Sequence, residues 1–185
     1  AFDGCSCGQV ALQRLGIEVK NYFSSEIDPY PIKVTQANFP NTIQIGDITK
    51  VDTSQLPKID LMMGGSPCQG FSFASNKQLN FDDPRSKLFF DFIRLRDELR
   101  PKYVLLENVR MSKESQDIIS KYMGCEPTKI NSSLSSAQNR NRLYWLVMLV
   151  GEVYKPIHIN QPEDKGIVMK DILEDLPFGE IPQYL

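Results

Sequence analysis

The 185-residue sequence predicts an α/β fold in which a mostly parallel sheet is covered by helices on both faces. Short apolar runs typical of buried strands alternate along the chain with segments whose apolar residues recur at helical spacing. Hydrophobic residues make up 41% of the chain and charged residues 24%, as in an ordinary globular domain with a substantial core. No apolar run approaches the roughly 18 residues that a membrane-spanning helix needs, so we expect no membrane association.

The periodicity places each element. The expected strands are 19–26, 42–47, 59–63, 103–109, 129–131 and 143–150. The expected helices are 9–15, 28–38, 85–99 and 114–123. Gly16 and Gly124 are natural helix stops, and Pro29 and Pro31 suit the first turn of the second helix. Pro101 follows the third helix, whose apolar residues share one face.

A glycine-rich turn carrying Cys68 follows the strand 59–63. In the sequence Gly64-Gly65-Ser66-Pro67-Cys68, the glycines allow a sharp turn and Pro67 stiffens it. Cys68 is therefore expected at the carboxyl edge of the sheet, where open α/β folds bind ligands. The alternative is a buried cysteine that fills a gap in the core.

The first three strands end in features that suit a nucleoside-bearing cofactor. The loop Phe2–Gly8 leads into a helix N-terminus, which offers backbone amides to a polar or anionic group. Glu26 lies where a carboxylate can accept hydrogen bonds from ribose hydroxyls. Asp47 could accept from an adenine amine, with Ile48 packed on the ring. The alternative is that each acid is an ordinary solvated loop residue.

A second set combines an acid with basic residues. Glu107 ends an apolar strand, and burial there would raise its pKa and keep the carboxyl protonated. The alternative is a salt bridge to an arginine, which would lower the pKa. Gln138, Arg140 and Arg142 alternate, so an extended segment would place them on one face; the alternative there is a solvated basic edge.

Charge and cysteine usage narrow the class of protein. The formal net charge of −2 does not indicate a polyanion partner, so a nucleic-acid enzyme would need a local basic surface. The four cysteines lack the spacing of a disulfide framework, which favours a reducing cellular compartment. The single histidine disfavours a zinc site. We expect no metal and no secretion.

Over nearly all of residues 2–150 the chain resembles the DNA (cytosine-5) methyltransferases. The matching motifs, in order, are Phe2-Asp3-Gly4, Glu26, Asp47, Pro67-Cys68-Gln69, Glu107-Asn108-Val109 and Gln138-x-Arg140-x-Arg142. Residues 81–90 also resemble the family's segment between loop and helix. The resemblance implies a Rossmann-like, S-adenosylmethionine-dependent methyltransferase fold, and residues 1–150 as the catalytic and cofactor-binding domain.

The resemblance also implies a reaction, the transfer of a methyl group from S-adenosylmethionine to carbon 5 of cytosine in DNA, leaving S-adenosylhomocysteine. Cys68 would add to carbon 6 of the base, which needs an activated thiolate. Glu107 would hold and protonate ring nitrogen 3. Arg142, with Arg140, would bind the carbonyl oxygen or an adjacent phosphate. Since the base must leave the duplex, the partner is double-stranded DNA with a flipped cytosine.

The resemblance implies further contacts. The cofactor residues would be Phe2, Asp3, Gly4, Cys5, Cys7, Glu26, Ile27, Asp47, Ile48, Pro67 and Leu88. Among them, Phe2 would pack on adenine and Asp3 would accept from the methionyl ammonium. Residues 69–84 would form a lid over the base. The DNA and lid residues would be Gln69, Ser72, Arg85 and Gln138.

The chain departs from the family pattern at both ends. Residues 151–185 are proline-rich, with one short helix near 169–176, and resemble a connector into a truncated target-recognition region. We expect a fragment whose front strand is clipped and which lacks the late motifs that complete the cofactor pocket. Such a fragment would bind cofactor weakly and methylate poorly.

Three other functions stay open at this point. A tRNA cytosine methyltransferase shares the motif set, and a catalytically incompetent homologue could act as a binding module. An NAD-dependent oxidoreductase would use a similar sheet, but the opening lacks Gly-x-Gly-x-x-Gly. The resemblance implies a cytoplasmic protein in a prokaryote or phage, as in restriction-modification, or a nuclear one in a eukaryote. It does not define the oligomeric state.

Overall fold

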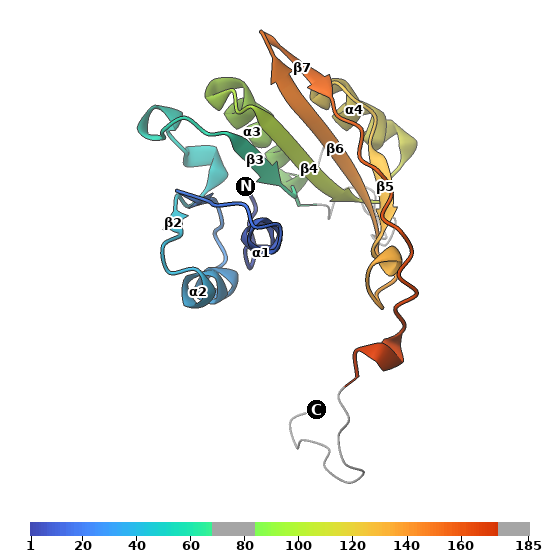
Figure 1. Cartoon of the computed structure of the whole chain (residues 1–185). Coiled ribbons are helices and arrows are strands. Elements are labelled where there is room, and N and C mark those ends of the chain that lie inside the picture. The colour runs from blue at the N-terminus through green and yellow to red at the C-terminus, as the bar shows by residue number, and fades with distance from the viewer. Residues whose placement is uncertain (68–83, 174–185) are drawn as a thin grey trace.

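The computed structural model describes residues 1–67 and 84–173, which form two sheets with helices beside them (Figure 1). The small sheet pairs β1 (Phe23–Ser24) with β2 (Ile43–Gln44) in parallel. The strands of the larger sheet are β3 (Leu61–Gly64), β4 (Tyr103–Val109), β5 (Thr128–Asn131), β6 (Asn141–Val150) and β7 (Val153–Pro156). Their order is β3-β4-β6-β5, and β7 also pairs with β6.

The larger sheet is mixed, so the prediction of a mostly parallel sheet was wrong. Only β3 and β4 run parallel there, whereas β6 is antiparallel to β4, β5 and β7. The connections explain the orientation, because parallel neighbours need a crossover of about a dozen residues or more. The turn between β6 and β7 is far shorter, with Gly151 at a φ of 62°. β7 was not among the predicted strands, and the domain boundary at residue 150 stays a prediction.

The four helices predicted between residues 9 and 123 are present, whereas the short helix predicted near 169–176 is a 3-10 turn where it is described. The four helices are α1 (Cys7–Arg14), α2 (Pro29–Asn38), α3 (Pro84–Leu99) and α4 (Lys113–Met123). Asp28 caps α2 by accepting from the Tyr30 amide at 2.9 Å, and Gly124 ends α4 at a φ of 77°. Short 3-10 turns lie at η1 (Ile48–Lys50), η2 (Thr53–Gln55), η4 (Ser132–Leu134) and η5 (Met169–Asp171). No helix in the described ranges is long and apolar enough to cross a membrane.

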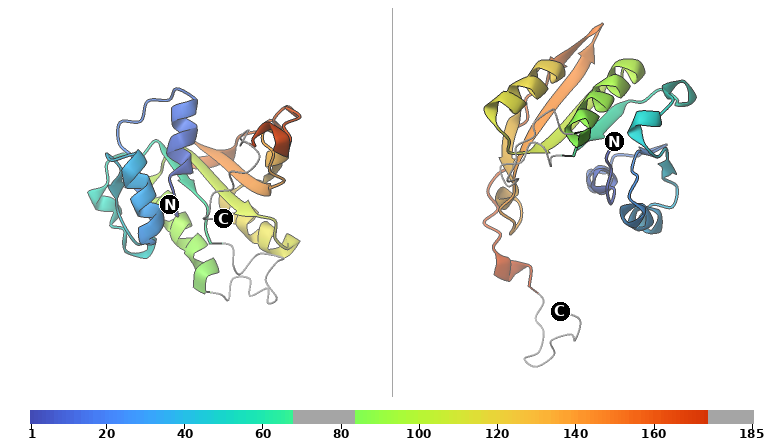
Figure 2. Two further views of the ribbon diagram at one scale, coloured as in Figure 1. Left: turned by 90° about the horizontal axis from the view of Figure 1, so that it is seen from below. Right: turned by 180° about the vertical axis from the view of Figure 1, so that it is seen from behind.

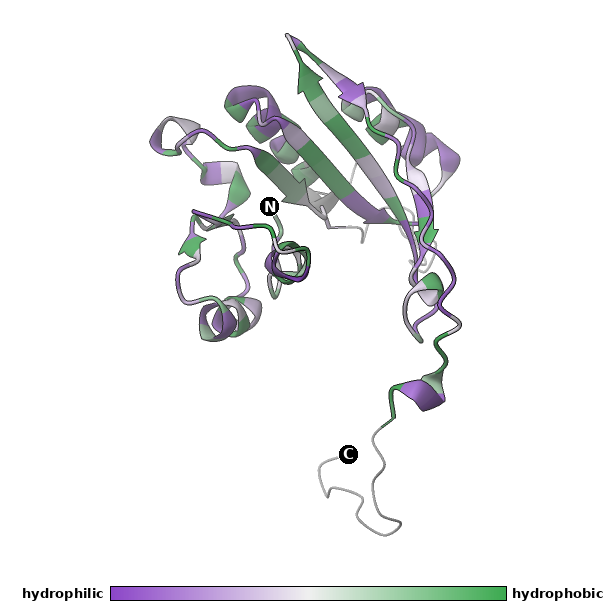
Figure 3. Ribbon diagram, in the orientation of Figure 1, coloured by the Kyte–Doolittle hydropathy of each residue, from purple (hydrophilic) through white to green (hydrophobic). Residues whose placement is uncertain are grey.

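The main core lies between the larger sheet and the helices α3 and α4, which share one face of that sheet (Figure 2). Alternate residues of β4 and β6 point into it, and Figure 3 shows the apolar residues along these strands. The fully buried core side chains are Phe89, Phe92, Val104, Leu106, Ile119, Met123, Trp145 and Val147. The predicted apolar face of 85–99 is therefore confirmed where side chains are described.

The first residues of the chain lie between the two sheets. The amino group of Ala1 donates to the Met63 carbonyl at 2.8 Å, and the Phe2 amide donates to Ser25 O at 2.8 Å. A cavity of about 540 Å³ lies beside them, and its walls come from both sheets, including Phe23, Ile45 and Leu61. The opening loop is therefore hydrogen-bonded both to the end of β1 and to the end of β3.

Candidate active site

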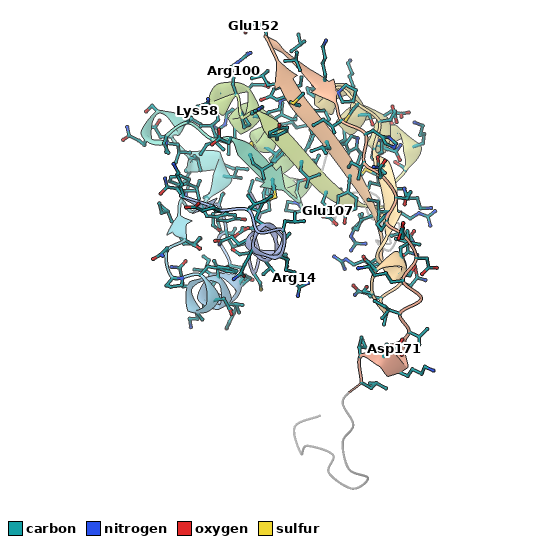
Figure 4. The ribbon with its side chains drawn as sticks, viewed as in Figure 1. Arg14, Lys58, Arg100, Glu107, Glu152 and Asp171 are labelled. Carbon is teal, nitrogen blue, oxygen red and sulfur yellow. The ribbon has the colours of Figure 1, made fainter. Side chains whose placement is uncertain are left out.

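The candidate site lies where strands end around the opening loop. Glu26 follows β1, Asp47 follows β2, the turn Gly65–Pro67 follows β3, and Glu107 lies near the end of β4. Figure 4 shows Glu107 on the part of β4 nearest to α1. Since the carboxyl ends of parallel strands are where open α/β sheets bind ligands, the predicted site residues are brought to the expected edge.

Glu26 holds the opening loop in place. Its Oε2 accepts from the Gly4 amide at 2.9 Å, and its Oε1 accepts from the amides of Ile27 and Asp28 at 2.8 and 3.0 Å. Gly4 has a φ of 56°, a left-handed conformation that glycine adopts without strain. A carboxylate offers about four acceptor positions, so Glu26 retains room for another donor.

Asp3 is already bonded within the loop. Its Oδ1 accepts from the Tyr22 hydroxyl at 2.6 Å, and its Oδ2 accepts from the Ser6 hydroxyl. Ser6 is fully buried at the N-cap of α1 with a φ of 59°. Tyr22 was not predicted as a site residue, because a partner 19 residues away in the sequence leaves no local pattern, and Ser6 was not predicted either. The expected contact between Asp3 and a methionyl ammonium stays a prediction.

Asp47 and Ile48 differ in what they can offer a ligand. Asp47 Oδ1 accepts from the amide and hydroxyl of Thr49 at 3.0 and 2.8 Å, and these bonds lower the pKa of Asp47 below its ordinary value. Its Oδ2 lies 3.7 Å from the Lys50 ammonium. Ile48 is only 4% exposed and belongs to the core. The expectation that its side chain packs on an adenine ring stays a prediction.

Of the other predicted site residues, some are described by the structure and some are not. Phe2 and Leu88 are partly buried against the core, whereas Cys5 and Cys7 are exposed. Ile27 is also exposed. The predicted residues Cys68, Gln69 and Ser72, like the Arg85 side chain, lie outside the described residues.

Glu107 and Arg142 form an ion pair, with 2.8 Å between Arg142 Nε and Glu107 Oε1. Side-chain exposure is 35% for Glu107 and 17% for Arg142. The expectation of a buried, unpaired carboxyl was therefore wrong, and the alternative of a salt bridge to an arginine is the one observed. A Cβ added at Gly65 would lie 3.0 Å from Glu107 Oε2. The glycine turn thus packs closely against the acid.

The other members of the basic motif do not share the position of Arg142. β6 begins at Asn141, so Gln138 and Arg140 precede the strand and are exposed. The Arg140 amide instead donates to Asn131 Oδ1 at 2.9 Å. The expectation that an extended segment places the three side chains on one face stays a prediction, and of the three it is Arg142 that pairs with Glu107.

Asn108 is hydrogen-bonded to the turn that precedes Cys68 in the sequence. Its Nδ2 lies 3.1 Å from Ser66 Oγ and 3.3 Å from Ser66 O, and its Oδ1 accepts from the Val109 amide at 2.8 Å. Asn108 is 1% exposed and Ser66 is 3% exposed. Asn108 was predicted only as part of a motif, with no role of its own. A polar residue in an apolar strand was the available signal.

Cys125 has the chemistry of a structural thiol. It is half-buried, and burial raises its pKa to about 11. The thiolate is the reactive form, so we expect Cys125 to react with iodoacetamide at pH 8 more slowly than the exposed Cys5 and Cys7. Mass spectrometry of the alkylated peptides measures this, and equal rates for Cys125 and Cys5 would contradict it.

Within residues 1–67 and 84–173, no three His, Cys, Asp or Glu side chains form a metal-binding group.

Comparison with known proteins indicates one protein family. A family model described as C-5 cytosine-specific DNA methylase matches residues 1–180. The chain is 52% identical over 93 residues to Type II methyltransferase M1.ScrFI of Lactococcus lactis subsp. cremoris, covering 50% of this chain and 23% of that protein. It is 30% identical over 191 residues to Type II methyltransferase M.HhaI of Haemophilus parahaemolyticus, covering 97% of this chain and 57% of that protein.

A solved structure supports the fold. It is described as a DNA modification methyltransferase encoded within a prophage of E. coli, and it superposes with a TM-score of 0.63 at 26% identity. The match covers 86% of this chain and 50% of that chain. The family uses S-adenosylmethionine as its methyl donor. The match over residues 1–180 shows that the chain belongs to the C-5 cytosine-specific DNA methylase family.

Proposed function

We propose that the protein transfers a methyl group from S-adenosylmethionine to carbon 5 of a cytosine flipped out of double-stranded DNA. The observation that carries the proposal is the Glu107–Arg142 ion pair, which lies against the glycine turn of β3. Asn108, the next residue along β4, is bonded to Ser66 in that turn, two residues before Cys68. Glu107, Arg142 and the turn that precedes Cys68 in the sequence thus lie together near the end of β4, which supports the proposal.

In the proposed reaction, the Cys68 sulfur forms a bond to carbon 6 of cytosine, and ring nitrogen 3 gains the proton that the thiol loses. Glu107 relays this proton, and Arg142 stabilises the charge on the carbonyl oxygen. S-adenosylmethionine supplies the methyl group to carbon 5. The carbon 5 proton then leaves to solvent, its electron pair restores the ring double bond, and the carbon–sulfur bond breaks. The departing sulfur takes back the proton from nitrogen 3.

The ion pair describes the enzyme before the base enters. Arg142 Nε lies 2.8 Å from Glu107 Oε1, and Arg142 Nη1 donates to the Asn141 carbonyl at 2.8 Å, so the two groups are held together before a base arrives. We infer that an entering cytosine separates them, because its carbonyl oxygen competes for the guanidinium and its nitrogen 3 competes for the carboxyl. The two groups are partly exposed, so this exchange does not require a buried charge to be left unpaired.

The residues at the ends of β1 and β2 fit the cofactor. Glu26 has acceptor capacity left for a ribose hydroxyl, and Asp47 Oδ2 is 3.7 Å from Lys50 and accepts no hydrogen bond from the described residues. Acceptors of this kind suit a ribose and an exocyclic amine. We propose Glu26 and Asp47 as the ribose and adenine contacts, together with the opening loop Phe2–Cys7.

The experiment is covalent trapping on DNA in which 5-fluorocytosine replaces cytosine. Fluorine at carbon 5 cannot leave as a proton does, so the sulfur bond to carbon 6 persists even when turnover is slow. We expect a denaturant-resistant adduct that requires S-adenosylmethionine, and mass spectrometry should locate it on the Cys68 peptide. S-adenosylhomocysteine in place of the methyl donor is the matched control.

Each other outcome favours a different function. An adduct on fluorinated RNA but not on DNA would favour the tRNA methyltransferase alternative. DNA binding without any adduct would favour an incompetent homologue. An adduct at another cysteine would contradict the assignment of Cys68.

A further inference from the structure

A partly buried chain of hydroxyl hydrogen bonds lies behind the opening loop and is not part of the proposed reaction. Tyr22, which precedes β1, donates to Asp3 Oδ1 at 2.6 Å. Ser6 donates to the other oxygen of Asp3. Both carboxylate oxygens of Asp3 are therefore occupied from inside the protein, and the loop is bonded to β1 by a side chain as well as by the Phe2 amide.

The Ser6 hydroxyl also has hydrogen-bond partners other than Asp3. Its Oγ lies 3.1 Å from Thr35 Oγ1 and 3.2 Å from Gln9 Nε2, and Gln9 Nε2 also donates to Thr42 Oγ1 at 2.8 Å. Thr35 is fully buried on α2 and also reaches the Gly4 carbonyl at 3.2 Å. Ser6 thus gains partners from both α1 and α2. These bonds offset the cost of its left-handed φ of 59°, which a non-glycine residue rarely adopts.

The first turn of α1 leaves room for the tyrosine. A Cβ added at Gly8 would lie 3.0 Å from the Tyr22 hydroxyl and 2.7 Å from Met63 Cε. Gly8 therefore allows the Tyr22 hydroxyl to pass close to the helix on its way to Asp3. Burial and the neighbouring Asp3 carboxylate raise the pKa of Tyr22 above its ordinary value, so the hydroxyl stays a donor at physiological pH.

We propose that Tyr22 is a positioning residue for S-adenosylmethionine, acting through Asp3 and Ser6 to fix the loop Phe2–Cys7 before the cofactor arrives. The inference rests on the proposed function. A loop fixed in advance does not lose its conformational freedom on binding, and this raises affinity without adding a contact to the ligand. Tyr22 is therefore expected to change cofactor affinity without touching the cofactor.

The test is Tyr22→Phe, which removes the hydroxyl and keeps the ring. Tyr154→Phe is the matched control, because the Tyr154 hydroxyl also donates one hydrogen bond, to the Pro101 carbonyl at 2.9 Å, away from the loop. We expect Tyr22→Phe to weaken S-adenosylmethionine binding about tenfold in calorimetry, the effect of losing one bond to a charged group. Tyr154→Phe should leave affinity unchanged.

Amide hydrogen exchange gives a readout that does not depend on the ligand. Peptides covering residues 2–8 should exchange faster in Tyr22→Phe and at the parental rate in Tyr154→Phe. Gly8→Ala is the second variant, because it crowds the Tyr22 hydroxyl while keeping it, and it should also speed exchange in the loop.

The outcomes separate the two proposals. Unchanged exchange in Tyr22→Phe would overturn the proposed role of Tyr22, and so would faster exchange with unchanged cofactor affinity. If the parent chain bound no S-adenosylmethionine, the proposed function and the cofactor role of Tyr22 would both be overturned. Equal loss of affinity in Tyr154→Phe would reduce the effect to general destabilisation and overturn the proposal.

Discussion

Replacing Arg142 with methionine is expected to slow formation of the 5-fluorocytosine adduct by about a hundredfold or more, the range seen when one donor to a developing oxyanion is removed. Among the described residues Arg142 is the cation that pairs with Glu107, at 2.8 Å, and methionine keeps the length and apolar stem of the side chain without its charge. The addition of Cys68 to the base would then lose the group that stabilises negative charge on the carbonyl oxygen.

The fold should survive this substitution. Arg142 is 17% exposed and Glu107 is 35% exposed, so the carboxylate left behind can be solvated. Thermal unfolding monitored by circular dichroism should therefore shift by only a few degrees, in line with a loss of about 1 kcal/mol in a domain of this size.

Arg100→Met is the matched control for charge removal. Arg100 pairs with Glu152 at the same 2.8 Å, but this exposed pair lies at the other end of the sheet (Figure 4). Arg140→Met tests a second point, because Arg140 is exposed and does not reach Glu107. We expect it to weaken DNA binding and its salt dependence more than the rate of addition. An unchanged rate in Arg142→Met would remove Arg142 from the proposed reaction.

Local signals account for what the sequence predicted well. Pro29 and Asp28 begin α2, Gly124 ends α4, and the alternation from Tyr103 to Val109 matches β4 at both ends. Each of these features depends on residues close together in the chain. The mixed sheet was missed because the direction of β6 depends on its short connections and on its pairing with β7, which lies in a segment with little strand pattern.

The sequence predicted where the site residues lie on the strands, but not which side chains they pair with. Glu26 and Asp47 lie at strand ends as expected, because strand length and direction are encoded locally. The partner of Glu107 depends on register: β6 places Arg142 opposite Val109, two residues from Glu107, and leaves Arg140 before the strand. The burial of Ile48 was not predicted because it is decided by packing in the core, and short-range patterns do not encode such packing.

Asn108→Ala is expected to lower both stability and the rate of adduct formation. The substitution leaves Ser66 Oγ and the Val109 amide without their partner, and a buried polar group without a partner costs about 1–3 kcal/mol. Urea unfolding should show a loss of about this size. Ser66 lies two residues before Cys68, so a loosened turn should also misplace the sulfur, and a small displacement of a reacting group can cost about a hundredfold in rate.

A matched substitution separates the two effects. Ser120→Ala removes the buried hydroxyl that accepts from Trp145 Nε1 at 3.0 Å, and so leaves a buried donor unpaired in the same core but away from the turn. It should lower stability by a similar amount and leave the rate of adduct formation unchanged at temperatures where both variants are folded. If Ser120→Ala slowed the addition as much as Asn108→Ala, the rate would be reporting overall stability. The role of Asn108 in holding the turn before Cys68 would then be excluded.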